Sequence, residues 1–347
     1  MRTRMWRRRI LLPSMIAVST LVGLTVGGAP ARAATCPATG TSSDDGSSIT
    51  CVTSPVAGDA RLVDVTIHST AMNADESVRL LLPTSYDTQP DRTWPVLYLL
   101  HGGASSSDMA SDHTDWSENT DVESRTAGRN VIVAMPDGGS AGWYSDWVGD
   151  PARWETFHTV ELRQLLERNY RAGSDRAIAG LSMGGFGALS YAGRHPGDFK
   201  AVAAYSGVAH PFGDPQGFQM LLAGSGKDIN ALWGDPTTTS GAATWQQHDP
   251  YYLVDNLASI PVYISSGDGT PGPDDDDPGL VNLETTTNTQ SQAVAQHLAD
   301  AYVAAHPGAS GDPLLTTHFY SPGVHTWPYW SRELDASLPT LLTAIDA

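Results

Sequence analysis

The amino-acid sequence predicts an α/β fold, with one mostly parallel central sheet and helices on both of its faces. Short runs that are apolar throughout, as buried parallel strands require, recur along the chain. Segments with helical spacing of apolar residues separate these runs, as in folds that alternate strands and helices. The length of 347 residues is enough for one large domain after an N-terminal leader. The sequence contains no evident internal repeat.

The first 33 residues have the features of a secretory signal peptide. They contain six arginines, then an apolar run that a proline and glycines interrupt, and an A-x-A sequence that ends at Ala33. We expect cleavage after Ala33 and a secreted protein, either extracellular or associated with the cell wall. The interrupted run is short for a bilayer span, so we expect no stable membrane insertion.

The charge of the chain restricts its partners. The formal net charge is −18, and removal of six arginines without any acidic residue leaves −24. Such a surface repels nucleic acid and anionic lipid headgroups, so we expect neither as a partner. The sequence leaves the oligomeric state open.

The two cysteines, Cys36 and Cys51, are expected to form a disulfide in an oxidising compartment. A bridge that closes a loop of this size stabilises the fold by roughly 3 kcal/mol. We therefore expect a disulfide-tied segment over 34–60, followed by a single catalytic domain over 61–347.

The elements of that domain follow in order. Two antiparallel strands are expected over 61–70 and 77–83, with 71–75 between them. Further strands are expected over 94–100, 130–136, 177–179, 199–206, 260–266 and 315–320. Helices are expected over 154–170, 289–306 and 329–345, and a cap or lid loop over 212–247.

Gly180-Leu181-Ser182-Met183-Gly184 forms a G-x-S-x-G pattern between an apolar strand and a helix. This arrangement is the nucleophile turn of the α/β-hydrolase fold, in which glycines allow a sharp and crowded bend. We expect Ser182 to be a nucleophile in a strained backbone conformation, with the Met183 N–H free to bind an oxyanion. The alternative is an ordinary glycine-rich turn.

A serine nucleophile requires a general base, which in this fold follows the acid in the sequence. His325 stands in a loop between the last strand and the last helix, so it is the expected base. Asp268 follows a strand directly and Glu284 precedes a helix, and either could orient the imidazole. The Gly103 N–H, after the strand over 94–100, is the expected second oxyanion donor.

The acidic run Asp274 to Asp277 is interpreted as a solvated loop, with a calcium loop as the alternative. We therefore expect neither a metal ion nor a cofactor.

The chain resembles the esterase-like α/β-hydrolases that include the antigen 85 mycolyltransferases and esterase D. The similarity runs from about residue 94 to the C-terminus. Its motifs are the nucleophile turn at 180–184 and the sequences WYSDW at 143–147, WETF at 154–157 and HTWPYW at 325–330.

The resemblance implies that Ser182 is the nucleophile and His325 the base, and it favours Glu284 over Asp268 as the acid. It also suggests that Trp327, Trp147 and Asp146 contact the substrate. Where mycolyltransferases carry D-G-L-R after the first central strand, this chain has H-G-G-A at 101–104. The aspartate and arginine that contact trehalose in that family are therefore not matched.

Three functions follow from these features. The first is a serine esterase that hydrolyses small-molecule, glycan or lipid esters through an acyl-enzyme. The second is an acyltransferase of the antigen 85 type, which passes the acyl group to a sugar or glycerol hydroxyl. The third is a non-catalytic protein that binds cell wall or matrix, because a fold does not fix a function.

Overall fold

The structure is a computed structural model that describes residues 33–36, 38, 40–104, 111–273, 275 and 281–347. The described residues belong to one compact unit. All but the last residue of the predicted signal peptide lie outside them. The predicted cleavage site after Ala33 falls within the first strand, β1 (Ala33–Thr35).

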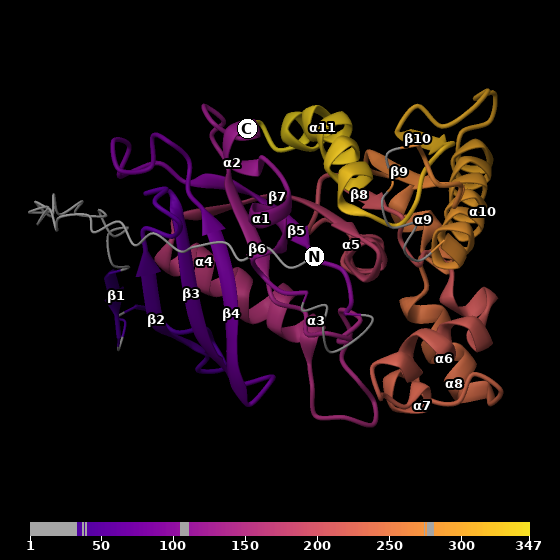
Figure 1. The fold of residues 1–347 in the computed structure, drawn as a ribbon, viewed down its shortest axis with the longest axis horizontal. Coiled ribbons are helices and arrows are strands. Elements are labelled where there is room, and N and C mark those ends of the chain that lie inside the picture. The colour runs from indigo at the N-terminus through magenta and orange to yellow at the C-terminus, as the bar shows by residue number, and fades with distance from the viewer. Residues whose placement is uncertain (1–32, 37, 39, 105–110, 274, 276–280) are drawn as a thin grey trace, which may run out of the picture. The chain divides into compact units, whose positions relative to one another are not determined.

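In the described part of the chain, ten strands form one sheet in the order β1-β2-β3-β4-β6-β5-β7-β8-β9-β10 (Figure 1). The first four strands are antiparallel to their neighbours; they are β1, β2 (Ser48–Ser54), β3 (Leu62–Ser69) and β4 (Ala74–Leu81). The predicted antiparallel pair is thus confirmed as β3 and β4. The second strand begins three residues earlier than predicted because a tight turn, with Asn73 at φ 51°, precedes it.

The other six strands are mutually parallel, as the apolar runs predicted. They are β5 (Trp94–Leu100), β6 (Ile132–Pro136), β7 (Ala172–Leu181), β8 (Val202–Tyr205), β9 (Val262–Gly267) and β10 (Leu315–Tyr320). The antiparallel pair β4–β6 joins this part to the first four strands. The carboxyl ends of parallel strands meet at one edge, where α/β folds place their sites.

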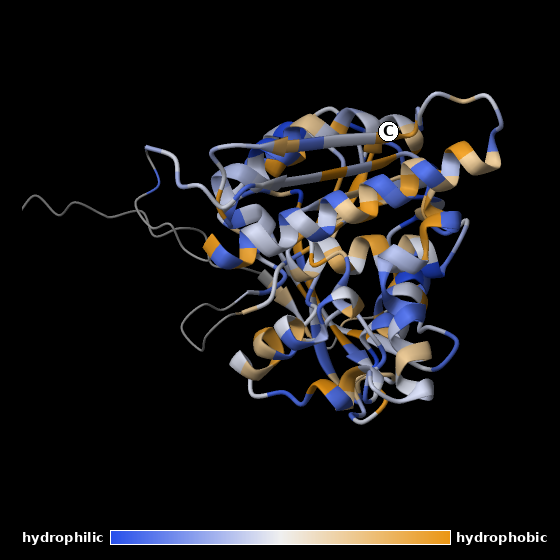
Figure 2. Cartoon of the chain, turned by 90° about the vertical axis from the view of Figure 1, so that its right-hand side faces the viewer, coloured by the Kyte–Doolittle hydropathy of each residue, from blue (hydrophilic) through white to orange (hydrophobic). Residues whose placement is uncertain are grey.

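Helices cover both faces of the sheet, as predicted (Figure 1). One face buries α1 (Asp115–Asn119), α2 (Val122–Arg125) and α11 (Trp327–Ala344). The other buries α3 (Trp154–Thr156), a π-helix (Phe157–Leu162), α4 (Arg163–Asn169), α5 (Met183–Arg194), α9 (Val254–Leu257) and α10 (Val281–Ala305). Hydrophobic and hydrophilic residues are interspersed along the helices on the side of the molecule that Figure 2 shows.

The predicted lid loop over 212–247 is largely helical, which corrects the sequence-based expectation. It forms α6 (Pro215–Gly224), α7 (Ile229–Trp233) and α8 (Thr239–His248), which lie together in Figure 1. The polar residues that suggested a loop are helix caps. The side chains of Asp214, Asp228 and Thr238 each accept a hydrogen bond from a backbone N–H of the helix that follows.

Helix α10 begins at Val281, eight residues before the predicted start at Thr289. The threonines after Glu284 have β-branched side chains, which disfavour helices. In the helix the Thr285 and Thr286 hydroxyls donate to the carbonyl oxygens four residues back, at 3.2 and 3.0 Å. Glu284 therefore lies on the first turn of α10 rather than in the loop before it.

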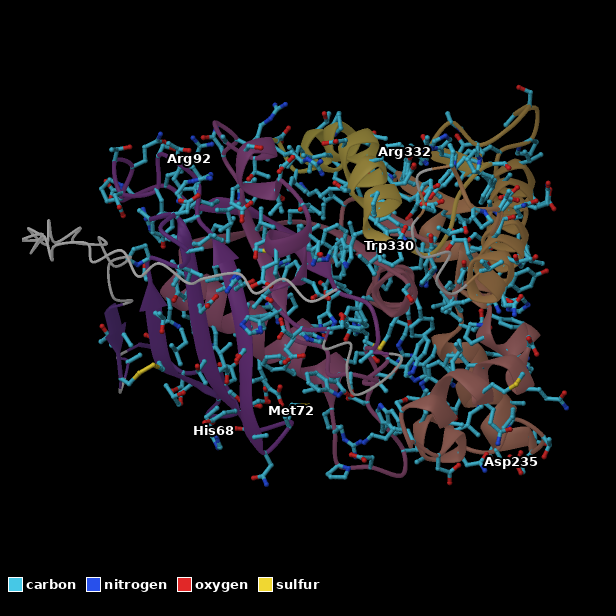
Figure 3. All side chains as sticks on the ribbon, viewed as in Figure 1. His68, Met72, Arg92, Asp235, Trp330 and Arg332 are labelled. Carbon is cyan, nitrogen blue, oxygen red and sulfur yellow. A yellow bond between two sulfur atoms is a disulfide. The ribbon has the colours of Figure 1, made fainter. Side chains whose placement is uncertain are left out.

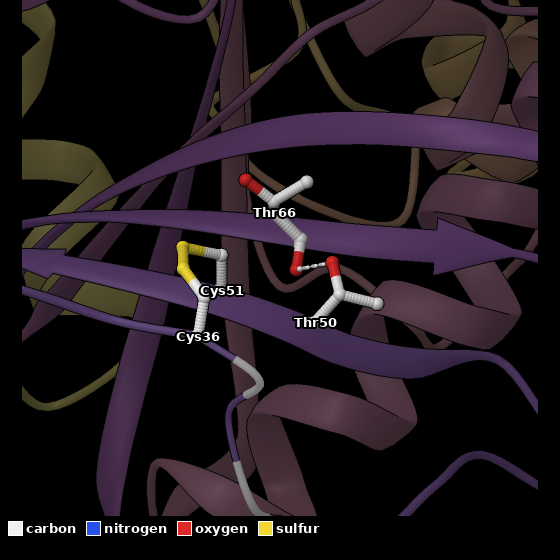
Figure 4. The surroundings of a disulfide bond; sticks show 4 residues. All are labelled: Cys36, Thr50, Cys51 and Thr66. Atoms are coloured by element: carbon white, nitrogen blue, oxygen red, sulfur yellow. Dashed lines mark hydrogen bonds between the residues drawn. A yellow bond between two sulfur atoms is a disulfide. The ribbon is translucent and has the colours of Figure 1, made fainter.

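The predicted disulfide joins Cys36, which follows the edge strand β1, to Cys51 of β2 (Figure 4). Next to it the Thr50 hydroxyl donates to the Thr66 carbonyl of β3 at 3.3 Å. The loop that the bridge closes also binds α4, because the Asn169 side chain accepts from the Thr41 N–H at 2.7 Å. The N-terminal segment is thus held at both a strand and a helix.

A helix that spans a membrane requires a minimum length and hydrophobicity. Across the described ranges, no helix is both long enough and apolar enough to pass through a bilayer.

Candidate active site

The predicted nucleophile turn lies where β7 meets α5. Ser182 adopts φ 52° and ψ −117°, a strained conformation for a residue with a side chain. A Cβ at Gly180 would lie 2.2 Å from the Gly184 oxygen, and one at Gly184 would lie 2.3 Å from the Leu100 oxygen. Both glycines of the pattern are therefore required by close backbone approach.

The two predicted oxyanion donors lie side by side. A Cβ at Gly103 would lie 3.5 Å from the Met183 sulfur and 3.2 Å from the Ser140 oxygen. Met183 is the first residue of α5, so its N–H has no acceptor within the helix. The Ala104 N–H donates to the same Ser140 oxygen at 2.9 Å, which holds the glycine loop in place.

His101 precedes this glycine loop and is buried. Its Nε2 accepts from the Gly138 N–H at 2.7 Å, so its Nδ1 is the protonated nitrogen and donates to the Gly102 oxygen at 2.6 Å. The Tyr144 hydroxyl donates to the His101 carbonyl at 2.9 Å. The side chain of His101 thus fixes the path of the loop that carries Gly103.

A buried carboxylate binds the predicted base. The distance from His325 Nδ1 to Glu284 Oε2 is 2.6 Å, and the two side chains are 4% and 0% exposed. Because Nδ1 donates to the carboxylate, the free lone pair of the imidazole is on Nε2. This Nε2 is buried and has no hydrogen-bond partner among the described residues.

The other carboxylate oxygen, Glu284 Oε1, accepts three hydrogen bonds. The donors are the Ser206 hydroxyl at 2.8 Å, the Ser266 hydroxyl at 3.0 Å and the Gly267 N–H at 2.6 Å. None of these donors carries a charge, so they orient the carboxylate without neutralising it. Among the described residues, no arginine or lysine pairs with Glu284, and His325 is its ionisable partner.

Asp268, the alternative acid, lies at a different place. Its side chain is exposed, and its Oδ1 accepts a hydrogen bond from the Thr270 N–H at 2.8 Å. Of the two carboxylates considered from the sequence, the one that the structure brings to His325 is Glu284.

The nucleophile turn is connected to this carboxylate through β8. The Ser182 N–H donates to the carbonyl of Tyr205, the last residue of β8, at 2.9 Å. The next residue, Ser206, is the one that donates to Glu284. The turn and the acid are therefore held by two consecutive residues.

The residues expected to contact the substrate differ in their surroundings. Trp327 is partly exposed and packs edge-on against Trp116, with ring centroids 5.3 Å apart. Trp147 is buried, and its indole N–H donates to the Gly142 oxygen at 2.9 Å. Both carboxylate oxygens of Asp146 accept from Thr156, at 3.0 and 2.6 Å. The assignment of these three residues to substrate binding stays a prediction, and Asp146 and Trp147 make their polar contacts within the chain.

Within the described residues, no group of three or more His, Cys, Asp or Glu side chains is arranged to hold a metal ion. Asp274, Asp276 and Asp277 of the acidic run lie outside these residues. Asp275 lies inside them, and its Oδ2 accepts from the Tyr329 hydroxyl at 2.9 Å.

The sequence did not predict the residues that surround Glu284, namely Ser206, Ser266 and Trp330. A signal for the two serines was present, because each is a polar residue at the carboxyl end of an otherwise apolar strand. Trp330 is the last residue of the HTWPYW motif at 325–330, but the sequence assigned it no role; its indole N–H donates to the Ser206 hydroxyl at 3.0 Å.

Comparison with known proteins assigns the chain to a family. The Esterase family model matches residues 69–341, which is most of the chain. The protein belongs to the Esterase family. The similarity to antigen 85 proteins that the motifs predicted is also confirmed by its relatives.

The esterase Rv1288 of Mycobacterium tuberculosis H37Rv is 36% identical over 220 residues, which cover 60% of this chain. The match spans 46% of that protein, so this member of the Esterase family corresponds to about half of its relative's length. The diacylglycerol acyltransferase/mycolyltransferase Ag85A of Mycobacterium ulcerans is 32% identical over 276 residues, covering 73% of this chain and 74% of that protein.

Solved structures of other proteins share the fold. MPT51 (FbpC1) of Mycobacterium tuberculosis aligns with a TM-score of 0.64 and 23% identity, covering 80% of this chain and 96% of that one. A ferulic acid esterase aligns with a TM-score of 0.59 and 24% identity, covering 82% and 98%. The predicted α/β-hydrolase fold is thereby confirmed.

Proposed function

We propose that this protein is a secreted serine esterase. Ser182 would attack the carbonyl carbon of a carboxylic ester, while His325 Nε2 accepts the hydroxyl proton. The observation that carries this proposal is the buried pair of Glu284 and His325, joined at 2.6 Å, whose outer nitrogen has no partner among the described residues. Such an imidazole can serve as a base only for a group that arrives at Nε2.

The other residues follow from this step. The N–H groups of Gly103 and Met183 would bind the oxyanion of the tetrahedral intermediate, each contributing about 3 kcal/mol to the barrier reduction. His325 then gives the proton to the leaving alcohol, and Glu284 stabilises the imidazolium between these transfers. Water, activated by the same nitrogen, releases the acid and restores Ser182.

The N-terminal sequence supports the secreted location. The arginine-rich start, the apolar run and the A-x-A sequence favour export, and the Cys36–Cys51 disulfide suits an oxidising compartment. Sequencing of the N-terminus of protein recovered outside the cells is the test. We expect it to begin at Ala34, whereas a start at Met1 would contradict the export proposal.

The nucleophile is tested with p-nitrophenyl esters. We expect Ser182→Ala to abolish turnover without lowering the melting temperature, while the exposed control Ser259→Ala retains it. Wild-type protein treated with phenylmethylsulfonyl fluoride should carry one sulfonyl adduct on the peptide that contains Ser182. A Ser182→Ala variant with near-native turnover would contradict the assignment. A wild type without turnover on any ester would favour the non-catalytic alternative.

An acyltransferase of the antigen 85 type is a second candidate, because relatives about 30% identical are named as diacylglycerol acyltransferases and mycolyltransferases. Both reactions share one acyl-enzyme and differ in the acceptor. At constant ester concentration, glycerol or trehalose is added and the transfer product is compared with the free acid. We expect free acid to dominate, because H-G-G-A at 101–104 replaces the D-G-L-R sequence of the mycolyltransferases.

A further inference from the structure

The buried Glu284 carboxylate is surrounded by groups that the reaction itself does not use. One of them, Trp330, lies on the first turn of α11 and is labelled in Figure 3. Its ring packs edge-on against His325, with centroids 4.9 Å apart. Its indole N–H donates to the Ser206 hydroxyl at 3.0 Å, and that hydroxyl donates to Glu284 Oε1 at 2.8 Å. Trp330 therefore contacts the imidazole and, through Ser206, the carboxylate bound to it.

The indole N–H of Trp330 determines the direction in which the Ser206 hydroxyl donates its hydrogen bond. An indole nitrogen can only donate, so the Ser206 oxygen is an acceptor on this side. Its single proton is then left for Glu284 Oε1. A hydrogen bond that feeds a second one in a buried site also polarises it, which strengthens the bond to the carboxylate.

The backbone places Ser206 for this contact. Ser206 follows β8 with φ 48°, in the left-handed region that a serine seldom adopts. Its N–H donates to the Ser265 oxygen of β9 at 2.7 Å, which holds the bend. Strain of this kind persists where the surroundings enforce it, and it is common at functional sites.

Ser266 provides an internal comparison, because its hydroxyl reaches the same carboxylate oxygen. That hydroxyl has three possible acceptors, namely Glu284 Oε1 at 3.0 Å, the Gly267 oxygen at 3.3 Å and the Thr287 hydroxyl at 3.4 Å. The Thr287 hydroxyl can donate either to Ser266 or, at the shorter distance of 3.0 Å, to the Glu284 carbonyl, so no donor is committed to the Ser266 hydroxyl. The Ser206 hydroxyl is directed by Trp330, whereas the Ser266 hydroxyl is free to turn.

We propose that Trp330 is a positioning residue, which directs the Ser206 hydroxyl onto Glu284 and so holds the carboxylate in the orientation that binds His325. This inference rests on the proposed esterase function. It adds two residues, Trp330 and Ser206, that act through Glu284.

The test is a double-mutant cycle on p-nitrophenyl ester hydrolysis. We expect Ser206→Ala to lower kcat about tenfold, the size typical for losing a hydrogen bond to a charged group, with KM unchanged. Trp330→Phe keeps the ring against His325 and removes only the N–H and the extra ring atoms. We expect it to lower kcat severalfold, and the double variant to lose no more than Ser206→Ala alone, because Trp330 acts through that hydroxyl.

Two controls separate positioning from stability. Trp94→Phe makes the same change at a buried tryptophan whose N–H has no partner in the described structure, at the opposite end of β5 from the site. It should lower the melting temperature about as much as Trp330→Phe does and leave kcat unchanged. Ser266→Ala should lower kcat less than Ser206→Ala.

Each of three results would overturn the inference. They are a double variant whose loss of kcat equals the product of the two single losses, an unchanged kcat in Trp330→Phe, and a larger loss of kcat in Ser266→Ala than in Ser206→Ala. These results are distinct from failure of the proposed function, which Ser182→Ala reports. If Ser182→Ala is inactive and the effects of Ser206→Ala and Trp330→Phe on the activation free energy add in the double variant, the proposed esterase function is retained and the proposed role of Trp330 is wrong.

Discussion

Two buried glutamates of the described structure, Glu284 and Glu333, each accept a hydrogen bond from the Nδ1 of a histidine, and the two pairs differ in the groups that surround the carboxylate. Glu284 receives three uncharged donors, and the His325 that it binds is buried. Glu333 is equally buried, but it is paired with Arg332 at 2.8 Å, and the side chain of its partner His318 is 48% exposed. Arg332 lies two residues along α11 from Trp330 (Figure 3).

The difference separates a pair suited to chemistry from a pair suited to stability. An arginine neutralises the carboxylate beside it, so little of the charge of Glu333 remains to polarise His318. Hydroxyl and N–H donors orient Glu284 and leave its charge to His325. Burial of a glutamate beside a histidine is therefore not a sufficient sign of a catalytic acid. The absence of an arginine or lysine beside Glu284 among the described residues is the feature that favours it as the proposed acid.

The largest effect is expected from Glu284→Gln, which keeps the shape of the side chain and removes its charge. Without that charge the imidazolium loses its stabilisation and the tautomer is no longer fixed. We expect kcat for ester hydrolysis to fall about 10³- to 10⁴-fold, as for the corresponding change in serine proteases. Asp268→Asn is the matched control and should stay within about twofold. A larger loss in Asp268→Asn would make Asp268 the acid.

A third buried glutamate, Glu155 of α3, also binds a histidine. Its carboxylate contacts Arg194 and His195 at the C-terminal end of α5, away from Ser182. Burial raises the pKa of its carboxyl, but the hydrogen bond from His195 and the charge of Arg194 outweigh this effect and lower the pKa to about 2. A pKa below the ordinary 4.5 stabilises the fold above that pH, and this contribution is lost as the pH falls towards 2.

We therefore expect Glu155→Gln to lower the free energy of unfolding by roughly 3 kcal/mol at neutral pH. The difference from the wild type should shrink as the pH falls from about 4.5 to 2, which urea unfolding at several pH values would measure. Activity of the folded variant at neutral pH should be retained. A difference in stability that does not depend on pH would contradict this account.

The smallest effect is expected from Glu333→Gln. The Tyr263 hydroxyl donates to Glu333 Oε2 at 2.7 Å, and a glutamine oxygen can accept the same bond. The lost pairing with the half-exposed Arg332 should cost about 1 kcal/mol of stability. We expect kcat to stay within about twofold of the wild type. A loss like that of Glu284→Gln would show that the presence of a cation does not distinguish the two pairs.

Most of the fold could be predicted because it depends on local patterns. The strands expected over 94–100 and 315–320 have the same bounds in the structure. The turn at Ser182 is likewise encoded within five residues, since its glycines are needed for contacts that a Cβ would block.

The parts that were missed depend on contacts between distant segments. The start of α10 was placed too late because hydrogen bonds within the helix satisfy its threonines, which propensity alone does not show. The family resemblance, not the residue pattern, favoured Glu284 over Asp268. The roles of Ser206 and Trp330 could not be predicted, because the bond between them joins residues 124 positions apart.

This separation has a consequence for the order in which the protein is made. The turn at Ser182 and the strand before it are complete once about half of the chain has been synthesised. The Ser206 hydroxyl meets its donor only when α11, the last helix, has emerged. In the proposed esterase, the nucleophile turn would therefore be synthesised well before Glu284, His325 and Trp330, and the proposed catalytic groups could assemble only once the last helix is present.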